Sequence, residues 1–333
     1  MKKIILCCDW GTTSLRIRLV NSPNGELLDE VRANLGIAKV FDAWKNQATL
    51  SNKNRIEFYL QALTPYINTL LNQSEVPNRE IPLVISGMAS SSIGMKELPY
   101  ADVPFGIDGR DTVVEVLNRP QGFDHEVLLI SGIRTSNDVM RGEEVQLIGM
   151  EKLIYSFSSA EDILIILPGT HSKHVRIKEN KIVNFDTFIT GELFALMNQN
   201  GLLKEAVKAP HVSNNATDWK YFLEGVHYSG EVGVLQSLFK VRTNDLFRKT
   251  NKEQNYFFLS GLLIGYELRS LKTRTHTLLI LCCQNGLFDF YKKAIEFLDM
   301  SHSMYMTAPE EVDQFTIFGQ LKIFEKHLIQ RLK

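Results

Sequence analysis

The sequence predicts an α/β protein that consists of two similar domains facing each other across a central cleft. Its 333 residues are too many for one small hydrophobic core and suit two domains. Short apolar runs that read as buried strands alternate with segments of helical periodicity. Two of these runs, at residues 3–8 and 163–167, lead into similar Gly-Thr turns, and the chain then returns as a second strand. The repeated hairpin indicates two copies of one domain.

The composition is that of an ordinary soluble protein. Hydrophobic residues make up 44% and charged residues 23%, and the net charge of −1 gives no reason to expect a polyanion-binding surface. No apolar stretch approaches the roughly 20 residues of a membrane helix, and the apolar run after Lys3 is too short for a signal peptide. We therefore expect a cytoplasmic protein with neither nucleic acid nor membrane as a partner.

The first hairpin has the residues of a phosphate-binding turn. The stretch "CCDWGTTSLR" carries an acid, Asp9, where the first strand ends. Glycine lets backbone N–H groups approach an anion, hydroxyl groups add donors, and a carboxylate at the strand end can hold a hydrated Mg²⁺. The predicted phosphate-binding residues of this turn are Gly11, Thr12, Thr13 and Ser14. The alternative is a plain hairpin turn of the same composition.

The second hairpin repeats the first with one change. When "ILIILPGTHSKHVRI" is placed under the first hairpin, Gly169 falls on Gly11, and Leu167 stands where Asp9 stands. Only the first copy therefore supplies a metal-side carboxylate. The predicted phosphate contacts of the second copy are Gly169, Thr170, His171, Ser172 and the cation Lys173. A backbone-bonded turn histidine and an exposed strand lysine are the alternatives for His171 and Lys173.

Further elements are predicted from apolar periodicity. Predicted strands lie at residues 81–88, 125–132 and 275–283. Predicted helices lie at residues 51–72, 141–153, 190–200, 217–225, 231–240, 254–272, 287–298 and 309–331. Pro65 is expected to kink or split the first helix. The sequence gives the weakest indication of packed structure at residues 156–162, which are the candidate crossing between the domains. The predicted domains are therefore residues 1–156 and 157–333.

The two hairpins resemble the phosphate motifs of the actin-like ATPase superfamily, which has a ribonuclease H-like fold and includes sugar kinases and Hsp70. More narrowly, the chain resembles the 2-dehydro-3-deoxygalactonokinase family over about residues 3–300. The segments that carry this resemblance are "DWGTTSLR", "SGMASSSIGMKELPY", "DVMRGEEVQLIG", "LPGTHSKHV", "FITGEL" and "FLSGLLIGYE". It implies phosphorylation of the C6 hydroxyl of 2-dehydro-3-deoxy-D-galactonate by ATP with Mg²⁺, a step of galactonate breakdown.

The resemblance also implies a catalytic base at the start of the helix before the second hairpin. Such a carboxylate accepts the proton of the attacking hydroxyl group. Glu143 is the first candidate, Asp138 the second and Glu144 the third. The alternative is that these acids stabilise the helix dipole and take no part in catalysis.

A sugar acid brings a carboxylate that needs a cation. Arg141 is the first candidate, and Arg16 is the second because related sugar kinases direct the arginine after the first turn toward the substrate. Each could instead be the structural partner of a local acid. The predicted lining of the sugar pocket is Ser91, Ser92, Gly94 and Tyr100. A solvated serine-rich turn is the alternative for this loop.

Members of the superfamily hold adenosine at a glycine-rich turn after the late strand. Here the turn reads Cys283-Gln284-Asn285-Gly286 and keeps a single glycine. The resemblance implies nucleotide contacts at this turn and in "FLSGLLIGYE", namely at Gln284, Asn285, Gly286 and Gly261. The departure leaves nucleotide selectivity open.

Two other functions stay open at this point. One is an ATP-binding regulator or scaffold of the actin-like fold, and the other is a sugar-sensing protein without kinase turnover. Asp9 argues against the sensor, since a sugar sensor needs no metal. The epimer of the sugar acid and the formation of a homodimer are not decided by the sequence.

Overall fold

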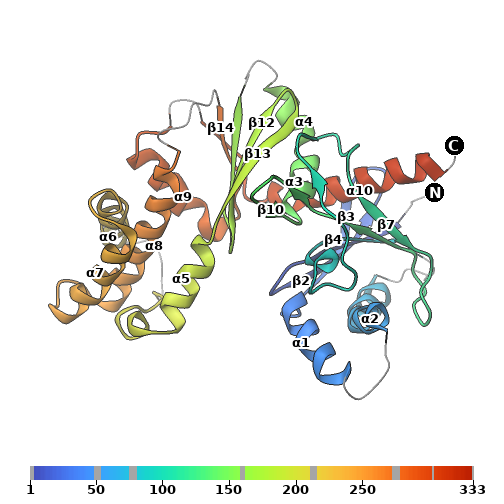
Figure 1. Ribbon diagram of the computed structural model, residues 1–333, viewed down its shortest axis with the longest axis horizontal. Coiled ribbons are helices and arrows are strands. Elements are labelled where there is room, and N and C mark those ends of the chain that lie inside the picture. Colours follow the sequence, from blue (N-terminus) through green and yellow to red (C-terminus); the bar gives the residue numbers. More distant parts are fainter. Residues whose placement is uncertain are drawn as a thin grey trace. The chain divides into compact units, whose positions relative to one another are not determined.

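A computed structural model describes residues 4–48, 54–74, 81–157, 162–210, 216–271, 278–301 and 304–331 (Figure 1). The chain divides into two compact units. Unit 1 comprises residues 1–158, 180–184 and 311–333, and unit 2 comprises residues 159–179 and 185–310. The predicted crossing at 156–162 falls largely on residues 158–161, outside the described part of the chain.

Unit 1 contains a six-stranded sheet with the order β3-β2-β1-β4-β8-β7. Its strands are β1 (Ile4–Trp10), β2 (Leu15–Asn21), β3 (Glu26–Ala33), β4 (Leu83–Gly87), β7 (Val114–Leu117) and β8 (Val127–Ile130). β1 pairs antiparallel with β2 and parallel with β4. β1 and β4 are apolar along nearly their whole length because both faces of the sheet are covered.

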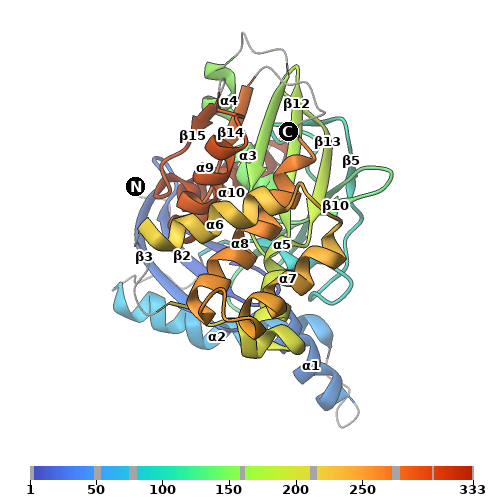
Figure 2. The same cartoon turned by 90° about the vertical axis from the view of Figure 1, so that its left-hand side faces the viewer.

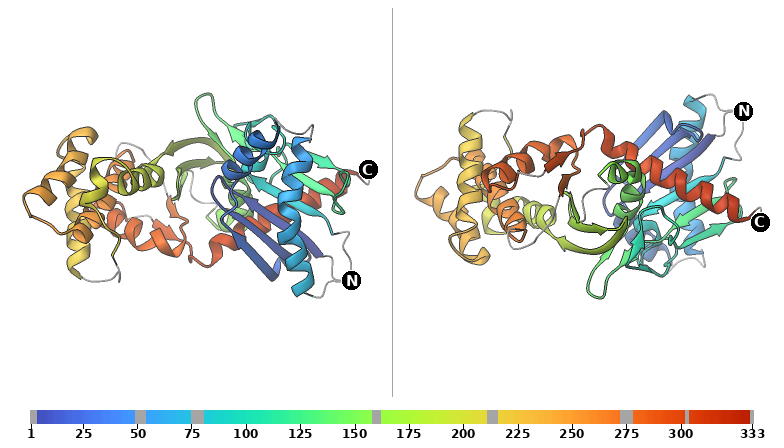
Figure 3. Two further views of the ribbon diagram at one scale, coloured as in Figure 1. Left: turned by 90° about the horizontal axis from the view of Figure 1, so that it is seen from below. Right: turned by 90° about the horizontal axis from the view of Figure 1, so that it is seen from above.

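Helices cover both faces of this sheet. The helices are α1 (Ile37–Ala48), α2 (Arg55–Gln73), α3 (Glu143–Gly149), α4 (Glu151–Ser156) and α10 (Glu311–Arg331). In Figure 3, α2 lies in front of the sheet in the left view and α10 in the right view, so the two helices lie on opposite faces. α2 is a single helix that contains Pro65, so the proline does not split it. The helix α1 was not predicted.

The last helix belongs to unit 1, whereas the sequence placed it in a second domain of residues 157–333. The reason is close backbone packing between α10 and α3. A Cβ atom on Gly319 would lie 1.9 Å from the Val145 carbonyl oxygen, and one on Gly149 would lie 1.8 Å from that of Phe315. Only glycine permits this approach. Gln320 also donates a hydrogen bond from α10 to the Cys8 carbonyl, 2.7 Å away.

The main sheet of unit 2 repeats that of unit 1. The full order is β15-β14-β11-β12-β13-β6, and the run β13-β12-β11-β14-β15 corresponds to β3-β2-β1-β4-β8. Its strands are β6 (Phe105–Gly106), β11 (Ile163–Leu167), β12 (Ser172–Lys178), β13 (Lys181–Phe188), β14 (Leu278–Leu281) and β15 (Met304–Met306). β6 and the start of β13 are counted in unit 1. The repeat read from the two hairpins is thus a repeat of a whole five-stranded unit.

The repeat extends to the helix that follows each third strand. Gly36 precedes α1, and a Cβ atom there would lie 2.1 Å from the Thr12 carbonyl oxygen. Gly191 belongs to α5 (Thr190–Gln199), and a Cβ atom there would lie 2.4 Å from the Gly169 carbonyl oxygen. In both units, therefore, a glycine at the start of a helix packs directly onto the Gly-Thr turn.

Helices form the rest of unit 2, as Figure 2 shows. They are α6 (Ala216–Tyr228), α7 (Val234–Leu246), α8 (Lys252–Arg269) and α9 (Asn285–Phe297), with a short 3-10 turn at Leu202–Ala206. Most of α8 is buried, because it packs against α5, α6, α7 and α9. A third, small sheet lies in unit 1, with the order β10-β9-β5 and strands β5 (Ala101–Asp102), β9 (Ile133–Arg134) and β10 (Val139–Met140).

Candidate active site

The first hairpin turn leaves its polar groups near solvent. Gly11 donates its N–H to the Ser14 carbonyl at 2.9 Å, which closes the turn. Thr13 and Ser14 are exposed, and Gly11 and Thr12 are half-buried. Thr13 and Ser14 at the tip of the turn are therefore accessible, as a phosphate-binding turn requires.

Asp9 lies one residue before the end of β1 and is half-buried. Burial raises the pKa of Asp9, while the Arg18 and Arg16 guanidinium groups lower it and Asp313 raises it further; the net direction is upward. The two arginines thus do not fully offset the cost of burying the Asp9 carboxylate. A bound cation would reduce that cost. Among the residues that the structure describes, no group of three or more His, Cys, Asp and Glu could hold a metal ion.

Arg16 does not stand free for a substrate. Its Nη1 donates to Asp313 Oδ1 at 2.8 Å. The buried Arg18 pairs with Glu30 at 2.8 Å and lies 3.2 Å from Asp313, and the exposed Arg32 contacts both acids. Arg16 is therefore the structural partner of an acid, which was the alternative to substrate binding. That acid, Asp313, comes from α10 and is not local in the sequence.

The acids at the start of α3 have different environments. Glu144 is buried, and its carboxyl oxygens accept the Gly142 N–H at 3.0 and 2.8 Å. Burial, with a further contribution from Glu143, raises the pKa of Glu144 to about 8, so the protonated form of this carboxyl group predominates at neutral pH. Glu143 is half-buried in the first turn, directly after Gly142, whose φ of 109° only glycine adopts readily.

Asp138 lies in the turn between β9 and β10. Its Oδ1 accepts the Val139 N–H at 2.7 Å, and its own N–H donates to Thr135 Oγ1 at 2.8 Å. These bonds stabilise the turn. Asp138 therefore has a structural task in this turn.

Arg141 is held in one orientation by four groups. Its Nη1 donates to Ser90 Oγ at 2.8 Å and to Ser131 Oγ at 3.3 Å, and its Nη2 donates to the Leu98 carbonyl at 3.0 Å. The guanidinium lies 3.9 Å from the centre of the Tyr100 ring. Its Nε is buried and has no hydrogen-bond partner in the described part of the chain. The structure therefore brings two predicted site residues, Arg141 and Tyr100, into contact.

The other predicted residues of the serine loop shape the loop itself. Ser91 is buried and donates its hydroxyl to the Met88 carbonyl at 2.7 Å. The Ser92 carbonyl accepts a hydrogen bond from Arg55 at 2.6 Å. A Cβ atom on Gly94 would lie 2.2 Å from the Ala89 carbonyl oxygen, so this position needs glycine. Sequence reasoning missed Ser90 and Ser131, whose contact with Arg141 spans separate loops.

In the second hairpin, the tip and the strand differ. Gly169 and His171 are half-buried and Thr170 is exposed, and His171 Nε2 contacts Glu192 Oε2 at 2.6 Å. Ser172 and Lys173 are buried, which is not what a phosphate contact or an exposed strand lysine requires. Lys173 Nζ donates to Thr187 Oγ1 at 2.7 Å, and the Ser172 hydroxyl bonds that of Tyr291 at 3.1 Å. Both side chains are turned inward because β12 is covered on both faces.

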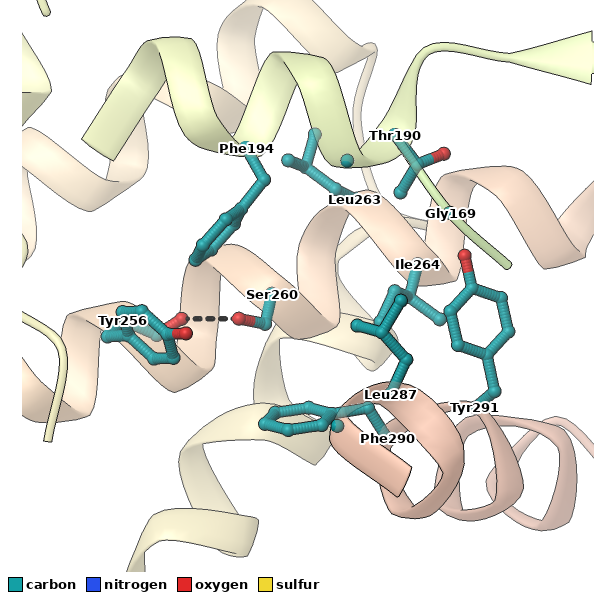
Figure 4. A pocket seen from close by; sticks show the side chains of 12 residues that line it. Gly169, Thr190, Phe194, Tyr256, Ser260, Leu263, Ile264, Leu287, Phe290 and Tyr291 are labelled. Carbon is teal, nitrogen blue, oxygen red and sulfur yellow. Dashed lines mark hydrogen bonds between the residues drawn. The ribbon is translucent and has the colours of Figure 1, made fainter. Parts of the chain in front are cut away.

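Unit 2 also contains a pocket next to this hairpin (Figure 4). Residues of α5, α8 and α9 form its walls, and the lining consists of Gly169, Thr190, Gly191, Phe194, Tyr256, Ser260, Leu263, Ile264, Gly286, Leu287, Phe290 and Tyr291. The walls are mostly apolar and aromatic, with the backbone of Gly169 at one end. A planar base against the rings and an anion near the hairpin would suit this arrangement.

Two glycines predicted as nucleotide contacts have different positions. Gly286 lines the pocket, and a Cβ atom there would meet no atom within 4 Å. Gly261 does not line it, because its open side faces α6, where a Cβ atom would lie 1.9 Å from the Phe222 carbonyl oxygen. The nearby Ser260 and Leu263 face the pocket instead. Gln284 and Asn285 lie at the start of α9 and are not among the lining residues.

The comparison with known proteins decides the family. Residues 9–316 match the sequence model of the family described as 2-keto-3-deoxy-galactonokinase. The chain belongs to this family. The resemblance read from the sequence motifs is thereby confirmed, and the kinase class is favoured over a regulator or sensor.

Relatives of this 2-keto-3-deoxy-galactonokinase family member cover most of the chain. A Rhizobium meliloti (strain 1021) protein, provisionally named a 2-dehydro-3-deoxygalactonokinase, is 29% identical over 299 residues, 86% of this chain and 87% of its own. The 2-dehydro-3-deoxygalactonokinase of Escherichia coli (strain K12) is 29% identical over 272 residues, 80% of each chain. A crystal structure from Sinorhizobium meliloti, provisionally described by the same activity, has a TM-score of 0.74 at 26% identity and covers 95% of both chains.

The predicted α/β fold class with two similar units is confirmed by the repeated strand order and by the match to the Sinorhizobium meliloti structure. Among the described helices, none is long and apolar enough to cross a membrane. Family membership implies a carbohydrate kinase that uses ATP.

Proposed function

We propose that this protein transfers the terminal phosphoryl group of ATP to the C6 hydroxyl of 2-dehydro-3-deoxy-D-galactonate. The observation that carries the proposal is the position of Arg141 and Glu143 on either side of Gly142. A cation fixed by Ser90, Leu98 and Tyr100 is followed at once by a half-buried carboxylate at a helix start. Recognition of an acidic substrate and removal of its hydroxyl proton would thus come from adjacent positions.

The remaining roles follow from what phosphoryl transfer needs, namely alignment and neutralisation of charge. Asp9 would hold Mg²⁺, which neutralises the ATP phosphates when bound. The turns at residues 11–14 and 169–171 would donate hydrogen bonds to phosphate oxygens. The pocket of unit 2 would take the adenosine between its aromatic walls, with Gly286 and Gly169 leaving room for the nucleotide.

The reaction is tested by coupled ADP release across a substrate panel. The panel contains 2-dehydro-3-deoxygalactonate, its gluconate-derived epimer, glucose and glycerol, each with MgATP. We expect the keto-acid to be turned over and glucose and glycerol to be poor substrates. Equal turnover of all four would contradict the proposal, and the two epimers decide the stereochemistry. Thermal shifts produced by the sugar acid alone, with no ADP release, would favour the sensor.

Replacement of Arg141 by glutamine is expected to raise the KM for the keto-acid by roughly 10- to 100-fold. The reason is loss of a charge-assisted pair with the substrate carboxylate, worth about 1.5–3 kcal/mol. The KM for ATP should change little. Steady-state kinetics with each substrate varied in turn measure both constants.

A matched control is Arg134→Gln on the neighbouring strand β9. Arg134 is exposed and pairs with the exposed Asp102 at 2.7 Å. This variant should leave both KM values within twofold of the parent. An Arg141 variant that raises the two KM values equally would mean that Arg141 only shapes the loop.

A further inference from the structure

Unit 2 buries a carboxylate that touches every element around the pocket. Glu267 of α8 is 2% exposed. It faces His174 Nε2 of β12 at 3.0 Å, accepts the Tyr291 hydroxyl of α9 at 2.8 Å and accepts the Thr190 hydroxyl at the start of α5. Thr190 and Tyr291 both line the pocket, and Figure 4 shows the Tyr291 hydroxyl directed toward Gly169 and Thr190.

The first connection from Glu267 to the hairpin has a fixed direction. An ionised carboxylate only accepts, so Tyr291 donates to Glu267, and the Ser172 hydroxyl then donates to the Tyr291 oxygen. The Ser172 oxygen in turn accepts the Gly169 N–H at 3.4 Å. Burial and the Glu267 charge raise the pKa of Tyr291 well above its usual range, so its hydroxyl keeps the proton that it donates. Each donor in the chain points toward the same negative charge, which strengthens the chain.

The second connection runs through the start of α5. The Thr190 hydroxyl is bonded to Glu267, and the two residues that follow it contact the hairpin. A Cβ atom on Gly191 would lie 2.4 Å from the Gly169 carbonyl oxygen, and the Glu192 N–H donates to the Thr170 carbonyl at 3.0 Å. Glu267 therefore reaches the hairpin from both sides.

We propose that Glu267 is a positioning residue for the nucleotide, acting through Tyr291 and Ser172 and through Thr190 on the second Gly-Thr turn. The inference rests on the proposed function, because the pocket and the turn must bind ATP. A buried charge is expensive to desolvate, and well-packed apolar residues often stabilise a fold equally well. What the charge provides here is one fixed arrangement of three elements that meet at the pocket. Ser172 then contributes by holding the turn and not by contacting phosphate.

The test is Glu267→Gln, which keeps the size of the side chain and replaces one acceptor oxygen by a donor. The variant removes the negative charge, so the Tyr291 and Thr190 hydroxyls, which share Oε2, lose a charge-assisted acceptor and meet either a neutral amide oxygen or an amide donor. We expect the KM for ATP, and the Kd for a non-hydrolysable ATP analogue measured by calorimetry, to rise about tenfold or more. The KM for the keto-acid should stay within twofold. A role confined to stability would lower Tm without this split between the two substrates.

Tyr291→Phe tests the route. It keeps the ring in the pocket wall and removes the hydroxyl between Ser172 and Glu267. If Glu267 acts through this hydroxyl, the double variant should have the ATP KM of Glu267→Gln within twofold. If the increases in the ATP KM of the two single variants multiply in the double variant, the route through Tyr291 is wrong. Tyr291→Phe also carries the test if Glu267→Gln does not fold.

The matched control is Tyr266→Phe on the same helix. The Tyr266 hydroxyl donates to the Val232 carbonyl and contacts Ser237 Oγ at 2.9 Å, and it does not line the pocket. This variant should lower Tm and leave the KM for ATP unchanged. If Glu267→Gln and Tyr291→Phe behave in the same way as the control, the inference is wrong while the proposed function stands. Failure of the wild-type protein to bind the ATP analogue would overturn both.

Discussion

Glu143→Gln is expected to lower kcat by about 10²- to 10⁴-fold, the usual loss when a general base is removed. Glutamine has the same size, so substrate binding and Tm should change little. The pH profile gives a second measurement, because the acidic limb of kcat/KM should disappear with the base. If Glu143 only stabilises the dipole of α3, the variant loses about 0.3–1 kcal/mol of stability and keeps its turnover.

Asp138→Asn separates the first two candidates for the base. The asparagine carbonyl can still accept the Val139 N–H, so the turn between β9 and β10 should survive. We expect less than a tenfold loss of kcat. A large loss here, with Glu143→Gln nearly normal, would move the base to Asp138. If neither variant loses more than tenfold while substrate still binds, the protein aligns the substrate without a base.

Asp9→Asn is expected to lower kcat by roughly a hundredfold or more, because the transition state loses the stabilisation provided by the metal site. The same variant should keep or raise Tm. A carboxyl group whose pKa is raised in the folded protein binds protons more readily there than in the unfolded chain, so its ionisation removes stability as the pH rises above 3.8. Asparagine removes that penalty at pH 7. Loss of turnover with no loss of stability marks a functional residue.

Magnesium gives this experiment a readout besides activity. The wild-type protein should gain thermal stability with Mg²⁺, and Asp9→Asn should not. Asp102→Asn is a suitable control, because Asp102 is exposed and its pKa is lowered by the hydrogen bond from Arg134. Near-normal turnover of Asp9→Asn at saturating Mg²⁺ would show that Asp9 only forms the turn.

The parts of the fold that could be predicted depend on contacts close in the sequence. Each unit contains one such hairpin, and its two strands are adjacent in the sequence. The alignment of Gly11 with Gly169 was therefore enough to reveal both units. The position of α10 was not predictable, because its packing depends on Gly149 meeting Phe315 and Gly319 meeting Val145. Nothing local in residues 309–331 identifies those partners.

The candidate site follows the same rule. Arg141 could be singled out because it precedes Gly142 in a recognisable motif, but its contacts with Ser90 and Ser131 join three separate segments. Gly261 was predicted as a nucleotide contact but does not line the pocket, since the sequence does not reveal which side of a largely buried helix faces a pocket. Phe194 and Phe290 form walls of that pocket and were not predicted as site residues, for the same reason.

The contact of Gln320 with β1 has a consequence for biosynthesis. The Gln320 side chain bonds the Cys8 carbonyl and the Ser86 hydroxyl, and the first of these contacts joins residues 312 positions apart. At about 5–20 residues per second, a ribosome needs roughly 15–60 s to extend the chain from the first partner to the second. Residues 185–310 of unit 2 emerge before α10, so that unit can complete its fold earlier. The half of the molecule that carries Asp9, although its first strands are made first, can reach its final structure only after the last helix has been synthesised.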